Sequence, residues 1–145
     1  MLIRPVRPAD AAAAAVLLGQ LGYPQDGEAA VASRLAAWAE DPSSAAFAAE
    51  SEGDVLGLIA VHVCPHFERD GAWGRIAALV VAEDARGRGV GGRLVAAAEL
   101  FAAAHGCQRM EVTSSDRRRE AHEFYRSRGY AAQTGRSSRF LRDLG

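Results

Sequence analysis

Hydrophobic and polar positions change their spacing several times along the first third of the chain. Residues 2–7 alternate apolar and charged side chains, which predicts a first strand. Residues 8–21 and 26–40 carry apolar side chains at helical spacing and predict two helices, with a break at residues 22–24. The chain therefore begins with a strand followed by two helices.

The middle of the chain changes to the shorter period of strands. Residues 45–50 and 55–63 predict two strands joined by a hairpin turn at 52–54. After a polar loop at 65–71, residues 74–81 predict a third strand that becomes strongly apolar at its end. These three strands follow one another without a helix, so we expect them to pair antiparallel.

The last third alternates between the two periods. Residues 90–105 predict an amphipathic helix that ends at Gly106, and residues 109–113 predict a strand. Residues 117–128 predict a last helix, and residues 130–141 predict a final hairpin around Gly135. The expected order is β-α-α-β-β-β-α-β-α-β-β, an α+β fold with four helices and a mixed, mostly antiparallel sheet of about seven strands.

Composition limits the class of protein but does not identify it. The 145 residues are enough for one domain, which we expect to span residues 1–145. The net charge of -1 gives no general attraction to nucleic acid or to anionic membranes. All 17 basic residues are arginine, which excludes a phosphate-binding Walker lysine and a Schiff-base lysine.

The sequence also predicts the compartment. Cys64 and Cys107 are far apart and form no CxxC pair, which is typical of free thiols in a reducing environment. The first residues show no signal-peptide apolar region, and no apolar run is long enough to span a membrane. We therefore expect a cytoplasmic protein with no membrane partner.

The most informative segment is the glycine–arginine loop, residues 86–92, between an apolar strand and an amphipathic helix. Glycines let the backbone approach a ligand closely, and the first amides of a helix attract an anion. Arg86, Arg88 and the following Arg93 add positive charge, so the loop predicts a pyrophosphate cradle. The alternative is a flexible connector with solvated arginines, but strand end, loop and helix start coincide here.

A nicotinamide-dinucleotide site is a rival interpretation of the same loop. Gly87, Gly89 and Gly92 match GxGxxG, and Glu111 lies about 20 residues farther on. That site needs a doubly wound parallel sheet near the N-terminus, which a single strand–helix–strand crossover does not supply. The strand pattern therefore disfavours this interpretation.

Two motifs resemble the GNAT superfamily of N-acetyltransferases. Arg86-x-x-Gly89-x-Gly91 is similar to its acetyl-CoA signature. Ala121-x-x-x-Tyr125, followed by Gly129-Tyr130, is similar to its second motif, and the order of elements matches over nearly the whole chain. One position departs from the usual pattern, because Arg118 stands where the family often has asparagine, as in a subset with R-x-x-A-H-x-F-Y.

The resemblance implies a fold, a cosubstrate and a set of site residues. It implies a GNAT fold in which acetyl-CoA places its pantetheine arm where two strands separate. The implied acetyl-CoA-binding residues are Leu79, Val80, Val81, Arg86, Gly87, Arg88, Gly89, Val90, Gly91, Gly92, Arg118 and Phe124. The guanidinium of Arg118 faces either the cofactor or the substrate, and the sequence does not distinguish the two. Dimers are common in this family, so a homodimer is an expectation.

Acetyl transfer to an amine assigns two catalytic tasks. The Tyr125 phenol, which the resemblance implies to lie near the thioester sulfur, is our candidate general acid for the leaving thiolate. An alkylamine of pKa about 10.4 must also lose a proton, which requires a base. Glu111 is the candidate base, by resemblance to a strand carboxylate of some ribosomal-protein acetyltransferases, and His62, His66 and His122 stay open as alternatives.

Two further clusters are assigned no function. His62, Cys64 and His66 alternate along a strand, but Pro65 interrupts it and no fourth ligand is evident, so no metal is expected. The three arginines at 117–119 form a short run without interleaved aromatics, so no nucleic-acid partner is expected.

The sequence therefore predicts an N-acetyltransferase that moves acetyl from acetyl-CoA to a primary amine of a small molecule, peptide or protein, by direct attack in a ternary complex. The alternative is a non-catalytic acetyl-CoA-binding sensor or interaction module.

Overall fold

The computed structural model describes residues 1–145, which form two compact units, Met1–Thr113 and Ser114–Gly145. The first unit contains the sheet and three α-helices, and the second contains one α-helix. The elements are β1 (Leu2–Pro5), the 3₁₀ turn η1 (Pro8–Asp10), α1 (Ala11–Leu21), α2 (Glu28–Glu40), β2 (Ser44–Ser51), β3 (Asp54–Pro65), β4 (Ala72–Val81), the 3₁₀ turn η2 (Glu83–Ala85), α3 (Val90–Ala104), β5 (Cys107–Val112) and α4 (Arg119–Ser127).

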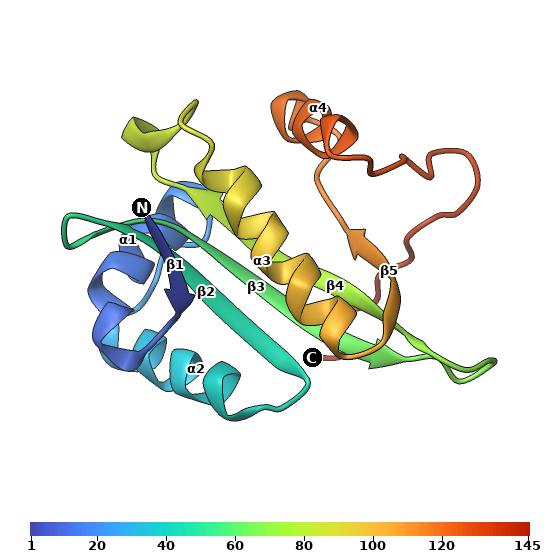
Figure 1. Cartoon of the computed structure of the whole chain (residues 1–145), viewed down its shortest axis with the longest axis horizontal. Coiled ribbons are helices and arrows are strands. Elements are labelled where there is room, and N and C mark those ends of the chain that lie inside the picture. Colours follow the sequence, from blue (N-terminus) through green and yellow to red (C-terminus); the bar gives the residue numbers. More distant parts are fainter. The chain divides into compact units, whose positions relative to one another are not determined.

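The sheet of the first unit has five strands in the order β1-β2-β3-β4-β5 (Figure 1). The first four strands pair antiparallel, and β4 pairs parallel with β5. The α3 helix connects these two parallel strands, as the single crossover in the sequence pattern predicts. The predicted mixed sheet and four helices are confirmed, but the expected seven strands are wrong, because the sheet has five.

The missing strands are those of the expected final hairpin at residues 130–141. The chain there forms a turn in which the Arg136 N–H donates to the Gln133 carbonyl at 3.0 Å, but no strand ladder flanks the turn. Residues 131–145 are all exposed. A hairpin needs apolar side chains on one face of both strands, and this polar, arginine-rich segment has few of them.

Alternation along β3 directs successive side chains to opposite faces of the sheet. Leu58 is buried with Val80 in a cluster that includes Ala14 and Leu17 of α1 and Val31 of α2. Its neighbour Gly57 faces α3 instead, as described below. The α1 and α2 helices therefore cover one face of the sheet, and α3 crosses the other (Figure 1).

Gly57 is a close-packing position between the sheet and α3. A Cβ atom at this residue would lie 2.9 Å from the Val80 carbonyl oxygen and 3.0 Å from Leu94 Cδ1. We expect Gly57→Ala to lower the free energy of unfolding by about 1–3 kcal/mol, because the overpacked backbone must shift. Gly19→Ala is the control, since α1 leaves open space there, and it should stabilise the chain by about 0.5–1 kcal/mol. Urea denaturation of both variants measures the difference, and equal stabilities would contradict this packing.

A buried ion-pair network fixes the start of the chain to the sheet. Asp10, only 6% exposed, accepts two hydrogen bonds from the Arg4 guanidinium at 2.8 and 2.9 Å. The same guanidinium donates to Glu50 on β2 at 3.1 and 3.2 Å. Asp10 also accepts the Arg7 N–H at 3.0 Å. The network thereby joins β1, β2 and the turn η1.

None of the helices combines the length and the apolar character that a membrane crossing requires.

Candidate active site

The second half of β4 has an open edge. β5 pairs with β4 only from Ala72 to Ile76, whereas β3 pairs with β4 as far as Val81. Residues 77–81 therefore have a neighbouring strand on one side alone. Backbone N–H and C=O groups that point away from β3 in this segment are available to an extended ligand.

A β-bulge marks the start of this open edge. Ala78 lies opposite Ala60 and Ile76 lies opposite Val61, so Ala77 is an extra residue in β4. Ala77 is exposed. A bulge bends its strand and increases the local twist. We therefore expect β4 to bend away from β5 at the point where their pairing ends. The predicted residues Leu79, Val80 and Val81 all lie on this open segment.

The α3 helix, which follows β4 and the glycine–arginine loop, has an uncapped N-terminus. Gly89 occupies the N-cap position in the left-handed region, with φ +78°, and no side chain caps the helix. The first backbone amides of α3, at residues 89–92, have no acceptor within the helix. These donors and the positive end of the helix dipole favour an anion at this point.

The glycine–arginine loop surrounds this helix start. Gly87, φ +79°, and Gly89 adopt a conformation that L side chains rarely take. Arg86 and Arg88 are exposed, Gly91 and Gly92 are half-buried, and Val90 is buried and anchors the first turn of α3. The predicted cofactor residues from Leu79 to Gly92 therefore follow one another along the open end of β4, the loop and the start of α3. Arg93, just beyond them, donates to the Met1 carbonyl at 2.9 Å.

The other predicted site residues belong to the second unit. Tyr125 packs against Phe124, with ring centroids 5.3 Å apart, and against Tyr130 at 5.7 Å. Arg118 is the N-cap residue of α4. Burial raises the pKa of the Tyr125 phenol, and the nearby Arg118 guanidinium partly offsets this. The phenol is therefore protonated at neutral pH, the state that a proton donor requires.

Glu111, the candidate base, forms an ion pair. Its carboxylate lies 2.6 Å from the Arg75 guanidinium on the neighbouring strand, and both side chains are exposed. Arg75 also donates to the Thr113 hydroxyl at 3.2 Å. The assignment of Glu111 as the base stays a prediction.

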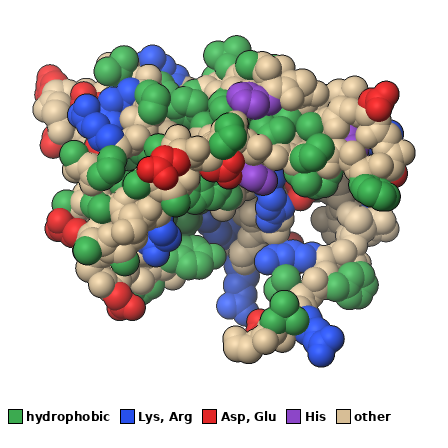
Figure 2. All heavy atoms as spheres, turned by 90° about the horizontal axis from the view of Figure 1, so that it is seen from below, with side chains coloured by type: hydrophobic (Ala, Val, Ile, Leu, Met, Phe, Trp, Pro, Cys, Tyr) green, Lys and Arg blue, Asp and Glu red, His purple; other side chains and the backbone are tan.

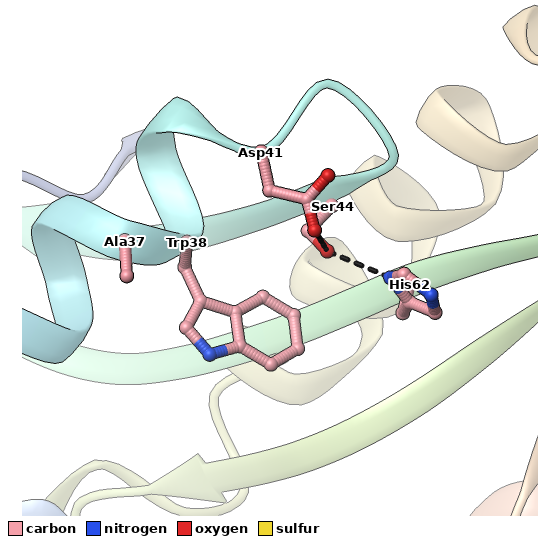
Figure 3. Close-up of a pocket in the computed structure, with 5 residues that line it drawn as sticks. All are labelled: Ala37, Trp38, Asp41, Ser44 and His62. Atoms are coloured by element: carbon pink, nitrogen blue, oxygen red, sulfur yellow. Dashed lines mark hydrogen bonds between the residues drawn. The ribbon is translucent and has the colours of Figure 1, made fainter.

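A second polar cluster was not predicted from the sequence. Asp41, at the C-terminal end of α2, accepts a hydrogen bond from the Ser44 hydroxyl at 2.9 Å, and Ser44 Oγ lies 2.8 Å from His62 Nδ1 (Figure 3). These three residues and the apolar Ala37 and Trp38 line a pocket of about 320 Å³. The sequence pattern placed Asp41 and Ser44 in a turn and gave no signal that His62 would lie beside them.

The remaining candidate histidines have other partners. His66 packs against Trp73, with ring centroids 5.1 Å apart, and His122 Nε2 lies 2.8 Å from the Ser115 carbonyl. Cys64 donates to the Pro65 carbonyl at 3.7 Å. No group of three or more His, Cys, Asp or Glu side chains is arranged to hold a metal ion. Figure 2 shows histidine side chains beside acidic ones and among hydrophobic ones on the face drawn.

The fold is that of an α+β protein in which an open strand edge is followed by an uncapped, glycine-rich helix start. The chain belongs to the acetyltransferase (GNAT) family, whose model matches residues 16–130. It is 37% identical to the aminoalkylphosphonate N-acetyltransferase of Salmonella typhimurium over 78 residues. That match covers 54% of this chain and only 51% of the relative.

Solved structures support the same fold. A GNAT family acetyltransferase of Staphylococcus aureus superposes with a TM-score of 0.80 at 23% identity, covering 99% of this chain and 98% of its own. The structure of AAC(6')-Iy in complex with the bisubstrate analog CoA-S-monomethyl-acetylneamine gives a TM-score of 0.83 at 19% identity, covering 98% of this chain and 97% of its own. At these identities the likeness establishes the fold alone.

Proposed function

We propose that this chain transfers an acetyl group from acetyl-CoA to a primary amine, with residues 1–145 acting as one catalytic domain. Membership of the acetyltransferase (GNAT) family supports the reaction class. The partial match to an aminoalkylphosphonate N-acetyltransferase favours a small-molecule amine as the acceptor.

The observation that carries this proposal is the open edge of β4 followed, a short loop later, by the uncapped start of α3. Acetyl-CoA combines an extended pantetheine arm, which has amide groups, with a diphosphate. The free backbone groups of residues 77–81 suit the amides, and the uncapped amides of α3 suit the diphosphate. Arg86 and Arg88 add positive charge at the same end.

Direct attack needs an unprotonated amine, a stabilised oxyanion and a proton for the departing thiolate. A backbone N–H of the open β4 edge is the simplest donor to the oxyanion, because it is fixed before the substrate arrives. Tyr125 supplies the proton in this proposal, since its raised pKa keeps the phenol protonated.

Two measurements on the whole chain test the proposal. Calorimetry should detect acetyl-CoA binding, and a thiol-release assay should show turnover with at least one amine of a panel that includes aminoalkylphosphonates. Binding without turnover on any amine would favour the alternative, a non-catalytic acetyl-CoA sensor. No binding at millimolar acetyl-CoA would remove the proposal altogether.

The assignment of Tyr125 is tested by its phenylalanine variant. We expect Tyr125→Phe to lower kcat by about 100-fold, at the lower end of general-acid effects, because a thiolate is already a fair leaving group. Tyr23→Phe is the matched control, since Tyr23 is 65% exposed in another part of the chain and should retain the wild-type rate. A Tyr125→Phe enzyme with unchanged kcat would exclude this tyrosine as the proton donor.

A further inference from the structure

The turn after α2 holds the Asp41 carboxylate in one orientation. Its Oδ1 accepts the Ser43 N–H at 2.9 Å and its Oδ2 accepts the Ser44 hydroxyl at 2.9 Å. The Ser44 N–H donates to the Asp41 carbonyl at 3.0 Å, and the Ser43 carbonyl accepts the Val63 N–H of β3 at 2.7 Å. The Ser43 amide, followed by the Ser44 hydroxyl, lowers the pKa of the Asp41 carboxyl, so it is ionised near neutral pH.

Counting protons in this cluster determines the form of the His62 ring. A hydroxyl group has one proton, and Ser44 donates it to the ionised Asp41. Ser44 Oγ is therefore an acceptor toward His62, so the proton of the neutral imidazole lies on Nδ1. Nε2 then carries a free lone pair, which can accept a proton.

The same cluster lies close to the open edge of β4. Ser44 is paired with His62 across β2 and β3, and His62 is paired with Arg75 across β3 and β4. Arg75 lies two residues before Ala77, where the open edge begins. His62 is thus one strand in from the edge on which we place the thioester, on the sheet face that α2 covers.

We propose that His62, in place of Glu111, is the general base that deprotonates the acceptor amine. Ser44 and Asp41 are positioning residues acting through it, and the pocket beside Trp38 receives the amine. This inference rests on the proposed acetyl transfer. The pocket of about 320 Å³ offers an indole ring and a carboxylate, which suit a small primary alkylammonium ion (Figure 3).

The proton transfers balance in this scheme. The bound ammonium gives one proton to His62 Nε2, and the neutral nitrogen attacks the acetyl carbonyl to form the C–N bond. The C–S bond then breaks, and its electron pair leaves with the thiolate. The nitrogen loses a second proton to solvent, the thiolate takes one from Tyr125, which solvent reprotonates, and the imidazolium returns its proton to solvent. The sum is an amide, a thiol and one released proton.

The charged and titratable groups around His62 agree with this role. Asp41 lies beyond Ser44 on one side, and Arg75 lies on the other, with its guanidinium directed to Glu111 and Thr113 on the β5 side. Cys64, two residues along β3, donates to the Pro65 carbonyl. His62 therefore has a negative partner through Ser44, while the nearest guanidinium is already paired with a carboxylate.

Three variants test the proposal by kcat/KM as a function of pH. His62→Gln should lower kcat/KM by about 100-fold and remove the decline of the rate at acid pH. Asp41→Asn and Ser44→Ala should each lower kcat/KM less than His62→Gln does, and should cause no further loss in the His62→Gln background, because they act through the imidazole. A merely structural role for these two residues would lower the rate further in the His62→Gln background.

The outcomes separate this inference from the proposed function. His105→Gln, at the C-terminal end of α3, is the control and should retain the wild-type profile, and calorimetry should give all four variants the wild-type affinity for acetyl-CoA. Wild-type turnover together with an unchanged rate and profile in His62→Gln would overturn the role of His62 alone. A further loss of rate from Asp41→Asn in the His62→Gln background would overturn the roles of Asp41 and Ser44. Absence of turnover in the wild-type chain would overturn the proposed function and this inference with it.

Discussion

Replacing Asp10 with asparagine is expected to lower the free energy of unfolding by about 3 kcal/mol at pH 7. The Arg4 guanidinium is nearly buried and donates to both Asp10 and Glu50, so the substitution leaves it with one carboxylate instead of two. Breaking a buried pair by removing one partner costs about 3–5 kcal/mol, and the remaining contact with Glu50 places this case at the lower end. Urea denaturation of both proteins at pH 7 measures the loss.

The Arg4–Asp10 pair also predicts how the difference in unfolding free energy between the wild-type chain and Asp10→Asn depends on pH. The Arg4 guanidinium, and after it the Arg7 N–H, hold the pKa of Asp10 below its ordinary value. Stabilisation by a carboxyl whose pKa is lowered on folding is complete above the unfolded value of about 3.9, and is lost as the pH falls through the folded value. The wild-type chain and Asp10→Asn should therefore approach each other in stability below about pH 4.

A surface variant provides the reference for this experiment. Asp26→Asn changes an exposed aspartate and should alter the free energy of unfolding by no more than about 0.5 kcal/mol. A loss of under 1 kcal/mol for Asp10→Asn at pH 7 would show that the Arg4–Asp10 pair contributes little to stability. A difference between the two proteins that stays constant into acid would show the same.

Replacing Gly89 with valine is expected to weaken acetyl-CoA binding by about 70-fold or more. A β-branched residue at φ +78° is strained by about 1–3 kcal/mol, and relief of that strain moves the loop out of its present conformation. The first amides of α3 would then no longer converge on the diphosphate. Loss of one or two hydrogen bonds to a charged group adds about 1.5–3 kcal/mol. Calorimetric titration with acetyl-CoA measures the change in affinity.

Gly106 is the matched control, because it lies just after the other end of the same helix. Its φ is +79°, and, as at Gly89, no atom lies within 4 Å of the position that a Cβ would take. Gly106→Val therefore introduces the same backbone strain without touching the anion site, and should lower stability but not affinity. Equal affinities in the two variants would mean that the start of α3 does not hold the diphosphate.

Much of the fold follows from the sequence because local signals agree with the packing. The helical spacing of apolar residues at 90–105 predicts α3 to within one residue, and Gly106 ends it with a positive φ. The turn around Gly53 predicts the hairpin of β2 and β3. The glycine–arginine loop could be predicted for the same reason. Glycine favours the positive φ observed at Gly87 and Gly89, and it has no side chain to cap the start of the helix.

The cluster around His62 depends instead on one irregularity in strand pairing. Next to the turn, Ser51 pairs with Asp54, and this register continued unchanged would place Ser44 opposite Val61. A bulge between Ala49 and Glu50 shifts the register by one residue, so Ser44 lies opposite His62. Because one residue of shift reverses the face of every side chain, a pattern of apolar and polar letters cannot locate this contact. The final hairpin failed for a different reason, since Gly135 marks a turn but no apolar face supports strands beside it.

The use of both faces of the sheet also bears on how the acceptor specificity of such a protein can change. The glycine–arginine loop and α3 belong to one face, and α2 with the Asp41 turn belongs to the other. Under the proposed chemistry, donor recognition and acceptor recognition draw on separate sets of positions. A single substitution at Ala37 or Trp38 can then change which amine is accepted, while the contacts with acetyl-CoA stay unchanged.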